Sequence, residues 1–206
     1  MGEIVDIGSR IELIPMDPHF HEISIGLYLQ EGDRPSFRVH SYSQKPGTAE
    51  RLSFIRDAMA VLGGMTQDGD TLAFSCGHEH NASVRRAFLE AGKLATGSEL
   101  VEKPLSTVDK KSGLTIRVVP EGEGAYRVTS EGEGKSPERR IKVVGNGLAK
   151  LGEMALLAED HVRYPCGQDH HALTGLLLVR APNVRAIVRE QEMNMSRGVL
   201  AAPSQQ

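Results

Sequence analysis

The sequence has little of what nucleic-acid-binding proteins use. Tryptophan is absent and aromatic residues make up only 4% of the 206 residues, so the aromatic platforms on which single-stranded bases stack are not expected. Neither sign of charge dominates, since 24 basic and 27 acidic residues give a net charge of −3. No block of lysine and arginine stands apart to neutralise phosphates. We therefore expect no nucleic-acid partner.

Long hydrophobic runs and a targeting segment are also missing. The longest clean apolar run, Leu176–Val179, is far shorter than the ~20 residues that span a bilayer. The first residues carry no basic segment followed by an apolar stretch, as a signal peptide would. With 39% hydrophobic residues and 22 glycines, the composition is that of a folded globular protein. We expect no membrane association, a cytoplasmic location, and two reduced cysteines that are not bonded to each other.

What the chain does contain is an internal similarity. A shift of 89 positions aligns Pro15 with Pro104, Arg51 with Arg140 and Met65 with Met154, without a gap. The apolar pattern moves with these identities. A helix-like stripe in the first copy falls on an equivalent stripe in the second, and both are predicted to be core: Leu52, Ile55, Met59, Leu62 and Ile141, Val144, Leu148, Leu151. Since fixed-period similarity is the mark of repeats, the sequence predicts a duplication.

Each copy is predicted to fold as strand, strand, helix, strand, helix. Strict alternation indicates strands, and glycines end the predicted helices. Because a strand–helix–strand unit makes its two strands parallel, we expect an α/β (α+β) fold with mixed sheets and helices on one side. The expected units are residues 11–93 and residues 99–192, followed by a flexible tail over 193–206.

Two loops share the pattern Cys-Gly-polar-acid-His at a strand-to-helix junction. They begin at Cys76 and Cys166 and place His80 and His170 four residues later. A cysteine before a helix N-terminus with a neighbouring histidine is a candidate nucleophile, which makes these four residues candidate catalytic groups. Thiolate sulfur and imidazole nitrogen also suit zinc or another divalent transition metal. A third interpretation is structural, with a buried cysteine, a glycine turn and a helix cap.

Histidines are concentrated in the first copy. His19 and His21 lie two residues apart, and His78 lies inside the first Cys-Gly loop. Because copy two has Gln168 in place of His78, the first copy is the stronger metal candidate. The predicted metal-ligand set is Cys76, His78, His80, His19 and His21.

The loop before the first helix of each copy carries a lysine and a hydroxyl residue, with an arginine one turn later. Such groups at a helix N-terminus suit an anion, although ordinary capping explains them too. The predicted ligand-binding residues are Lys45, Thr48 and Arg51 in the first copy and Lys135, Ser136 and Arg140 in the second.

Three classes of function follow, the simplest of which is a purely structural subunit; the other two use the Cys-Gly loops. One is a non-catalytic module that binds a small ligand or a metal through the paired Cys-Gly loops. The other is a hydrolase- or transferase-type enzyme that uses Cys76 or Cys166 with a histidine, or a bound zinc, on a small anionic substrate. The sequence does not identify the ligand, the oligomeric state or which loop is functional.

Overall fold

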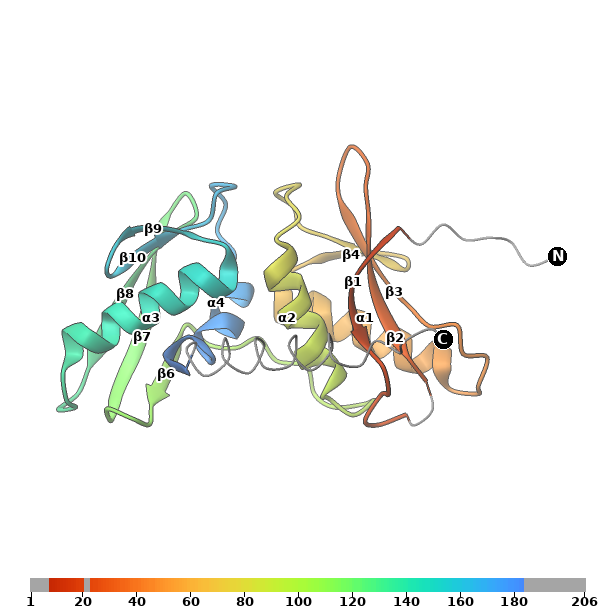
Figure 1. The fold of residues 1–206 in the computed structure, drawn as a ribbon, viewed down its shortest axis with the longest axis horizontal. Coiled ribbons are helices and arrows are strands. Elements are labelled where there is room, and N and C mark those ends of the chain that lie inside the picture. Colours follow the sequence, from red (N-terminus) through yellow and green to blue (C-terminus); the bar gives the residue numbers. More distant parts are fainter. Residues whose placement is uncertain (1–7, 21–22, 184–206) are drawn as a thin grey trace, which may run out of the picture.

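The computed structural model describes residues 8–20 and 23–183, which form two halves lying side by side (Figure 1). The first half contains β1 (Ser9–Ile14), β2 (Ile25–Gln30), β3 (Ser36–His40), α1 (Thr48–Gly63), β4 (Thr66–Asp68), β5 (Thr71–Ala73) and α2 (Asn81–Gly92). The second contains β6 (Ser106–Asp109), β7 (Leu114–Gly122), β8 (Ala125–Glu131), α3 (Pro137–Gly152), β9 (Ala155–Ala158), β10 (His161–Arg163), α4 (His171–Leu178) and a 3-10 turn, η1 (Ala181–Asn183). The predicted tail, 193–206, and residues 184–192 of the second predicted unit lie outside the described residues.

Each half builds one five-stranded sheet, and the two sheets have the same strand order. The orders are β1-β2-β3-β5-β4 and β6-β7-β8-β10-β9, and all neighbouring strands are antiparallel. The α/β class is confirmed, but the prediction of mixed sheets is wrong.

The error comes from a strand that was not predicted directly after the long helix of each half, β4 in the first half and β9 in the second. After α1 the chain forms β4 and then turns through Gly69, which has φ 57°, into β5. This hairpin reverses the chain, so β5 runs antiparallel to β3. Asp68-Gly69 is a hairpin-turn signal, but all three residues of β4 are exposed, so no apolar alternation marks the strand.

The predicted helix stripes do pack into the core. Ile55, Met59, Leu62, Val144 and Leu148 are buried. The remaining members, Leu52, Ile141 and Leu151, are partly buried and pack against the same core. The period of the pattern therefore located the buried face of both helices.

The halves meet through α2 and α4, which lie in the middle of the molecule and contact each other (Figure 1). Polar contacts cross the same boundary. Arg180 forms an ion pair with Glu90 at 3.0 Å, and the Ser75 hydroxyl donates to the Gln168 side chain at 3.3 Å. These contacts join the end of β5 and the length of α2 to the second half.

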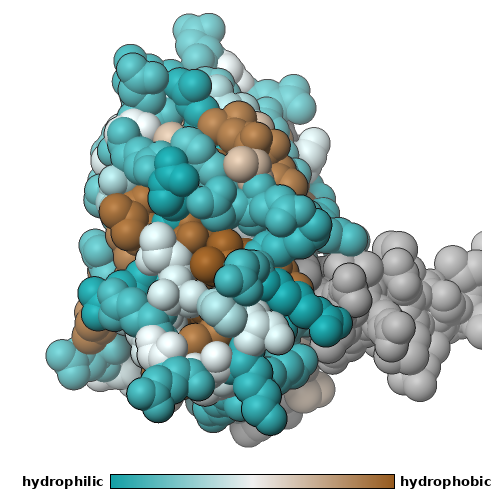
Figure 2. Space-filling model, turned by 90° about the vertical axis from the view of Figure 1, so that its left-hand side faces the viewer, coloured by the Kyte–Doolittle hydropathy of each residue, from teal (hydrophilic) through white to brown (hydrophobic). Residues whose placement is uncertain are grey.

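Apolar side chains on the outer end of the second half do not form a continuous face. Figure 2, which looks onto this end, shows apolar residues separated by hydrophilic ones. Among the described helices, none has both the length and the apolar character that crossing a membrane requires.

A buried ion pair occurs at the same place in both halves. In the first half, Arg51 donates from Nε and Nη2 to Asp17 at 3.0 and 2.9 Å, and both side chains are almost completely buried. In the second half, Arg140 donates to Asp109, which is also buried. Because α1 and α3 each place this arginine against the end of the first strand or the segment just after it, the pair holds that part of the chain against the helix.

We predict that breaking the first pair is costly. Arg51→Met leaves the Asp17 carboxylate buried without a partner, so the free energy of unfolding should fall by about 3–5 kcal/mol. Guanidinium denaturation measures the loss. The matched control is Arg38→Met, because the Arg38–Asp70 pair is much more exposed and should contribute about 1 kcal/mol or less. Equal losses in both variants would contradict the assignment.

Candidate metal site

The two Cys-Gly loops come together between the halves. Each follows a short strand, β5 or β10, and each turns through a glycine with a left-handed backbone, φ 71° at Gly77 and 70° at Gly167. Such angles favour glycine because it has no side chain to clash. The loops then lead into α2 and α4, so that His80 and His170 occupy equivalent positions immediately before the two helices.

Four donor atoms meet where these loops face each other. The Cys76 Sγ lies 3.3 Å from His80 Nε2, and the Cys166 Sγ lies 3.2 Å from His170 Nε2. The thiol sulfurs and imidazole nitrogens of these four residues all lie within 4.8 Å of one another. The cluster is therefore a two-cysteine, two-histidine set to which each half contributes one of each.

Backbone amides point at both sulfurs. The amide of His78 donates to Cys76 Sγ at 3.4 Å, and the amide of Gln168 donates to Cys166 Sγ at 3.5 Å. Hydrogen bonds from amides favour the thiolate over the thiol. The two loops thus offer the same environment to a thiolate that binds a cation.

The main chain of His170 is tightly held. Its amide donates to the Tyr126 hydroxyl at 2.7 Å, and its carbonyl accepts from the Thr174 hydroxyl at 2.7 Å. The Asp169 carboxylate accepts from the amide of Gly124 at 2.9 Å. These bonds fix the loop against the β7–β8 turn, and they use the acidic residue of the motif to position the loop.

The His80 backbone is in the left-handed region, with φ 47° and ψ 44°. This conformation is uncommon for residues other than glycine, although histidine adopts it more often than most, as do asparagine and aspartate; residues held in it cluster at functional sites. Neither His80 nor His170 caps its helix with a side-chain hydrogen bond. The side chains of the two histidines therefore do not act as helix caps, as the structural interpretation of the motif expected.

Aromatic rings enclose the two imidazoles. Phe74 lies against His80 with ring centroids 5.0 Å apart, and Tyr164 lies 4.8 Å from His170, while the two imidazoles are 4.6 Å apart. Burial, together with the neighbouring His170 and His78, lowers the pKa of His80 to about 4. Burial also lowers the pKa of His170 and raises that of the Cys76 thiol.

The other predicted metal ligands do not belong to this cluster. His19 Nε2 contacts the carbonyl of Lys93 at 2.7 Å, and His78 Nδ1 contacts the carbonyl of Cys76 at 3.2 Å. Neither belongs to the four-residue group, and His21 lies outside the described residues. The predicted catalytic residues Cys76, His80, Cys166 and His170, in contrast, all come together.

The predicted anion-binding residues divide between the halves. Lys135, Ser136 and Arg140 line one pocket. Arg51 lines another, without Lys45 or Thr48, and all three of its guanidinium nitrogens are already bonded to Asp17 or to the carbonyls of Gly92 and Leu94. Sequence reasoning missed Lys111 and Arg139, which line the first pocket; their positive charge was the available signal.

Comparison with known proteins finds no similarity: the chain matches no protein-family model, no curated protein and no solved structure.

The buried imidazoles predict how stability depends on pH in protein that has been treated with a chelator and is free of metal. An unfolded histidine has a pKa of about 6.5, whereas that of His80 in the folded chain is about 4. The unfolded state therefore binds more protons over this interval, so the free energy of unfolding should decrease as the pH falls from about 6.5 to 4. Denaturation at several pH values tests this. His80→Gln should flatten the profile, and an unchanged slope would contradict the prediction.

Proposed function

We propose that this chain is a metal-binding module in which one zinc ion, held by Cys76, His80, Cys166 and His170, joins the two halves. The observation that carries the proposal is the convergence of four donor atoms within 4.8 Å, two from each half. Cysteine and histidine in equal number are one of the common ligand sets of structural zinc sites.

The distances within each pair support a tetrahedral ion. With zinc–sulfur bonds of about 2.3 Å and zinc–nitrogen bonds of about 2.0–2.1 Å, a tetrahedral angle separates sulfur from nitrogen by roughly 3.5 Å. The observed separations are 3.3 and 3.2 Å. Small adjustments of the side chains would therefore complete the coordination.

The number of ligands favours a structural role over a catalytic one. Catalytic zinc sites keep a position open for water or substrate, whereas four protein ligands close the shell. The enzyme alternative, a thiolate nucleophile paired with an imidazolium, has less support. Burial raises the pKa of Cys76 and lowers that of His80, so at neutral pH the unmetallated pair is neutral.

The similarity of the two halves also bears on how the site arose. The strand orders are equivalent, and the two loops repeat the same turn and the same amide–sulfur bonds. We take this as support for a duplication in which each copy retained half of the ligand set. A reducing compartment such as the cytoplasm would keep both thiols available for the metal.

We predict one zinc ion per chain in protein purified without a histidine tag, measured by elemental analysis. Cys166→Ser or His170→Ala should reduce the stoichiometry to near zero at micromolar chelator concentrations, because each removes a quarter of the ligand set. The matched control is His78→Ala, which removes a neighbouring imidazole outside the cluster and should retain the ion.

The same variants show what would contradict the metal assignment. Absence of stoichiometric metal from the wild-type chain, also after addition of zinc or cobalt, would overturn it. Equal loss in His78→Ala and His170→Ala would place the ion elsewhere. Chelation should also lower the melting temperature, because an ion present at 1,000 times its dissociation constant stabilises the folded state by about 4 kcal/mol.

The reactivity of the two thiols distinguishes cysteines that bind a metal from a cysteine that acts as a nucleophile. We predict that both cysteines of the metallated chain resist iodoacetamide, and that a chelator makes them reactive while the chain remains folded. A nucleophilic thiolate would instead alkylate without chelation, with a midpoint below the ordinary thiol pKa of about 8.5. Mass spectrometry after digestion identifies the modified residue.

A further inference from the structure

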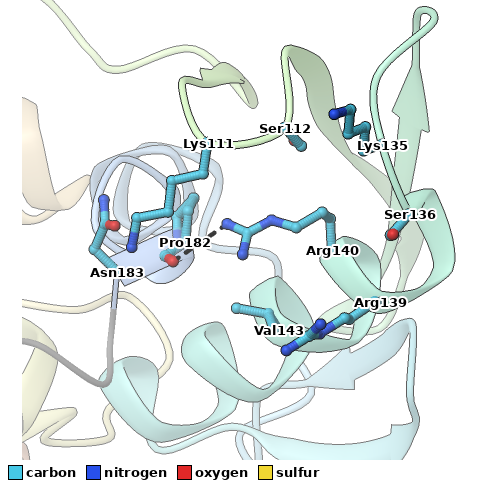
Figure 3. Close-up of a pocket in the computed structure, with 9 residues that line it drawn as sticks. All are labelled: Lys111, Ser112, Lys135, Ser136, Arg139, Arg140, Val143, Pro182 and Asn183. Atoms are coloured by element: carbon cyan, nitrogen blue, oxygen red, sulfur yellow. Dashed lines mark hydrogen bonds between the residues drawn. The ribbon is translucent and has the colours of Figure 1, made fainter.

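A second feature of the molecule belongs to the second half and uses none of the residues of the two Cys-Gly loops. Here a pocket of about 330 Å³ opens between the β6–β7 turn, the loop before α3, and the first turns of α3. Its polar lining comes from Lys111, Ser112, Lys135, Ser136, Arg139, Arg140 and, on the side of η1, Asn183 (Figure 3). Among the described residues, no aspartate or glutamate lines it.

We propose that this pocket binds a small phosphate-bearing anion. Three of its four cationic side chains, those of Lys111, Lys135 and Arg139, form no ion pair within residues 8–20 and 23–183. They come from three separate segments around one hollow (Figure 3). Like charges gathered in this way repel one another, and an anion between them would relieve that repulsion.

The equivalent place in the first half shows that this charge is specific to the second. That pocket is lined by His19, Phe20 and Glu50 together with Arg51. Glu50 stands where Arg139 stands after the shift of 89 residues, so the charge is reversed. The Phe20 ring also lies about 3.0 Å from the position that a Cβ on Gly47 would take. The first-half pocket therefore lacks the cationic excess of the second.

The arginines of the two Arg–Asp pairs also differ, because Arg140 is more exposed than Arg51 and leaves one nitrogen unbonded among the described residues. In Arg51, every guanidinium nitrogen is bonded, and the side chain is 1% exposed. Arg140 uses Nε for Asp109 and Nη2 for the carbonyl of Pro182, and its side chain is 15% exposed. Among the described residues, nothing accepts a hydrogen bond from its Nη1. Arg140 therefore keeps one nitrogen for a ligand while Asp109 holds it in place.

The chemistry of the lining indicates the class of ligand. A volume of about 330 Å³ is at the lower end of small-molecule sites, so a compact ligand fits better than a polymer. Guanidinium groups donate in a geometry that matches phosphate oxygens, and lysines add point charges. The Ser136 hydroxyl also lines the pocket. A phosphate monoester or a diphosphate would use these groups together.

Binding of inorganic pyrophosphate and inorganic phosphate, measured by calorimetry at low ionic strength, tests the proposal. We expect saturable binding of at least one of them by the wild-type chain. Arg139→Glu introduces the residue found in the first half and should weaken binding at least tenfold, and Lys111→Gln and Lys135→Gln should each weaken it severalfold. These side chains are exposed, so the melting temperatures should stay close to that of the wild type.

The control is Lys150→Gln, which removes one exposed lysine of α3 outside the pocket and should change the affinity less than twofold. No saturable binding by the wild-type chain at millimolar phosphate and pyrophosphate would overturn the proposal. Equal weakening by Lys150→Gln and Lys135→Gln would also overturn it, because the attraction would then be diffuse. Zinc-free protein that keeps its fold should bind the anion equally well, so the two proposals can fail separately.

Discussion

A buried guanidinium–carboxylate pair organises each half of this molecule. Burying two charges costs several kcal/mol per ion unless every hydrogen bond is well made, so the partners must be held in one arrangement. Arg51 meets this demand by binding Asp17 and the carbonyls of Gly92 and Leu94 at the end of α2. It thereby joins the segment after β1, the start of α1 and the end of α2. Since α2 begins directly after His80, this anchor also positions one ligand of the Cys/His cluster.

The second half repeats the arrangement with small changes. Arg140 binds Asp109 and the carbonyl of Pro182. Burial alone would raise the pKa of Asp109, but hydrogen bonds from Ser112 and Arg140 outweigh it and hold that pKa below the ordinary value. The carboxylate therefore stays ionised, and Arg140 remains fixed beside the cationic pocket. The same Arg–Asp pair thus holds the end of α2 in the first half and lies beside the cationic pocket in the second.

Much of the fold could be predicted from the sequence, because the signals were local. The stripe that contains Ile55 and Met59 identified the buried face of α1, and glycines marked the helix ends. The strands β4 and β9 could not be recognised, since all their residues are exposed and no alternation distinguishes them from a loop. Asp17 and Asp109 were also missed. They lie 92 positions apart, so the shift of 89 that aligns their arginine partners does not align them.

The sequence predicted which residues form the candidate site, but it did not predict that the two loops meet. The repeated Cys-Gly-polar-acid-His pattern singled out all four members of the cluster. Assigning the ligands to one loop, with His19 and His78, followed from counting histidines along the chain. The packing of α2 against α4 decides which loops meet, and no local pattern reports on that packing. One cysteine and one histidine in each half were the available signal for a site shared between the halves.

The division of donors between the halves has a consequence for affinity. A single loop offers one sulfur and one nitrogen, and a two-donor chelate would lose its ion readily. Because both loops belong to one polypeptide and α2 already contacts α4, the second pair of donors is present at a high effective concentration. Capture of the proposed ion would then be nearly independent of protein concentration, which would not hold if the two loops resided on separate chains.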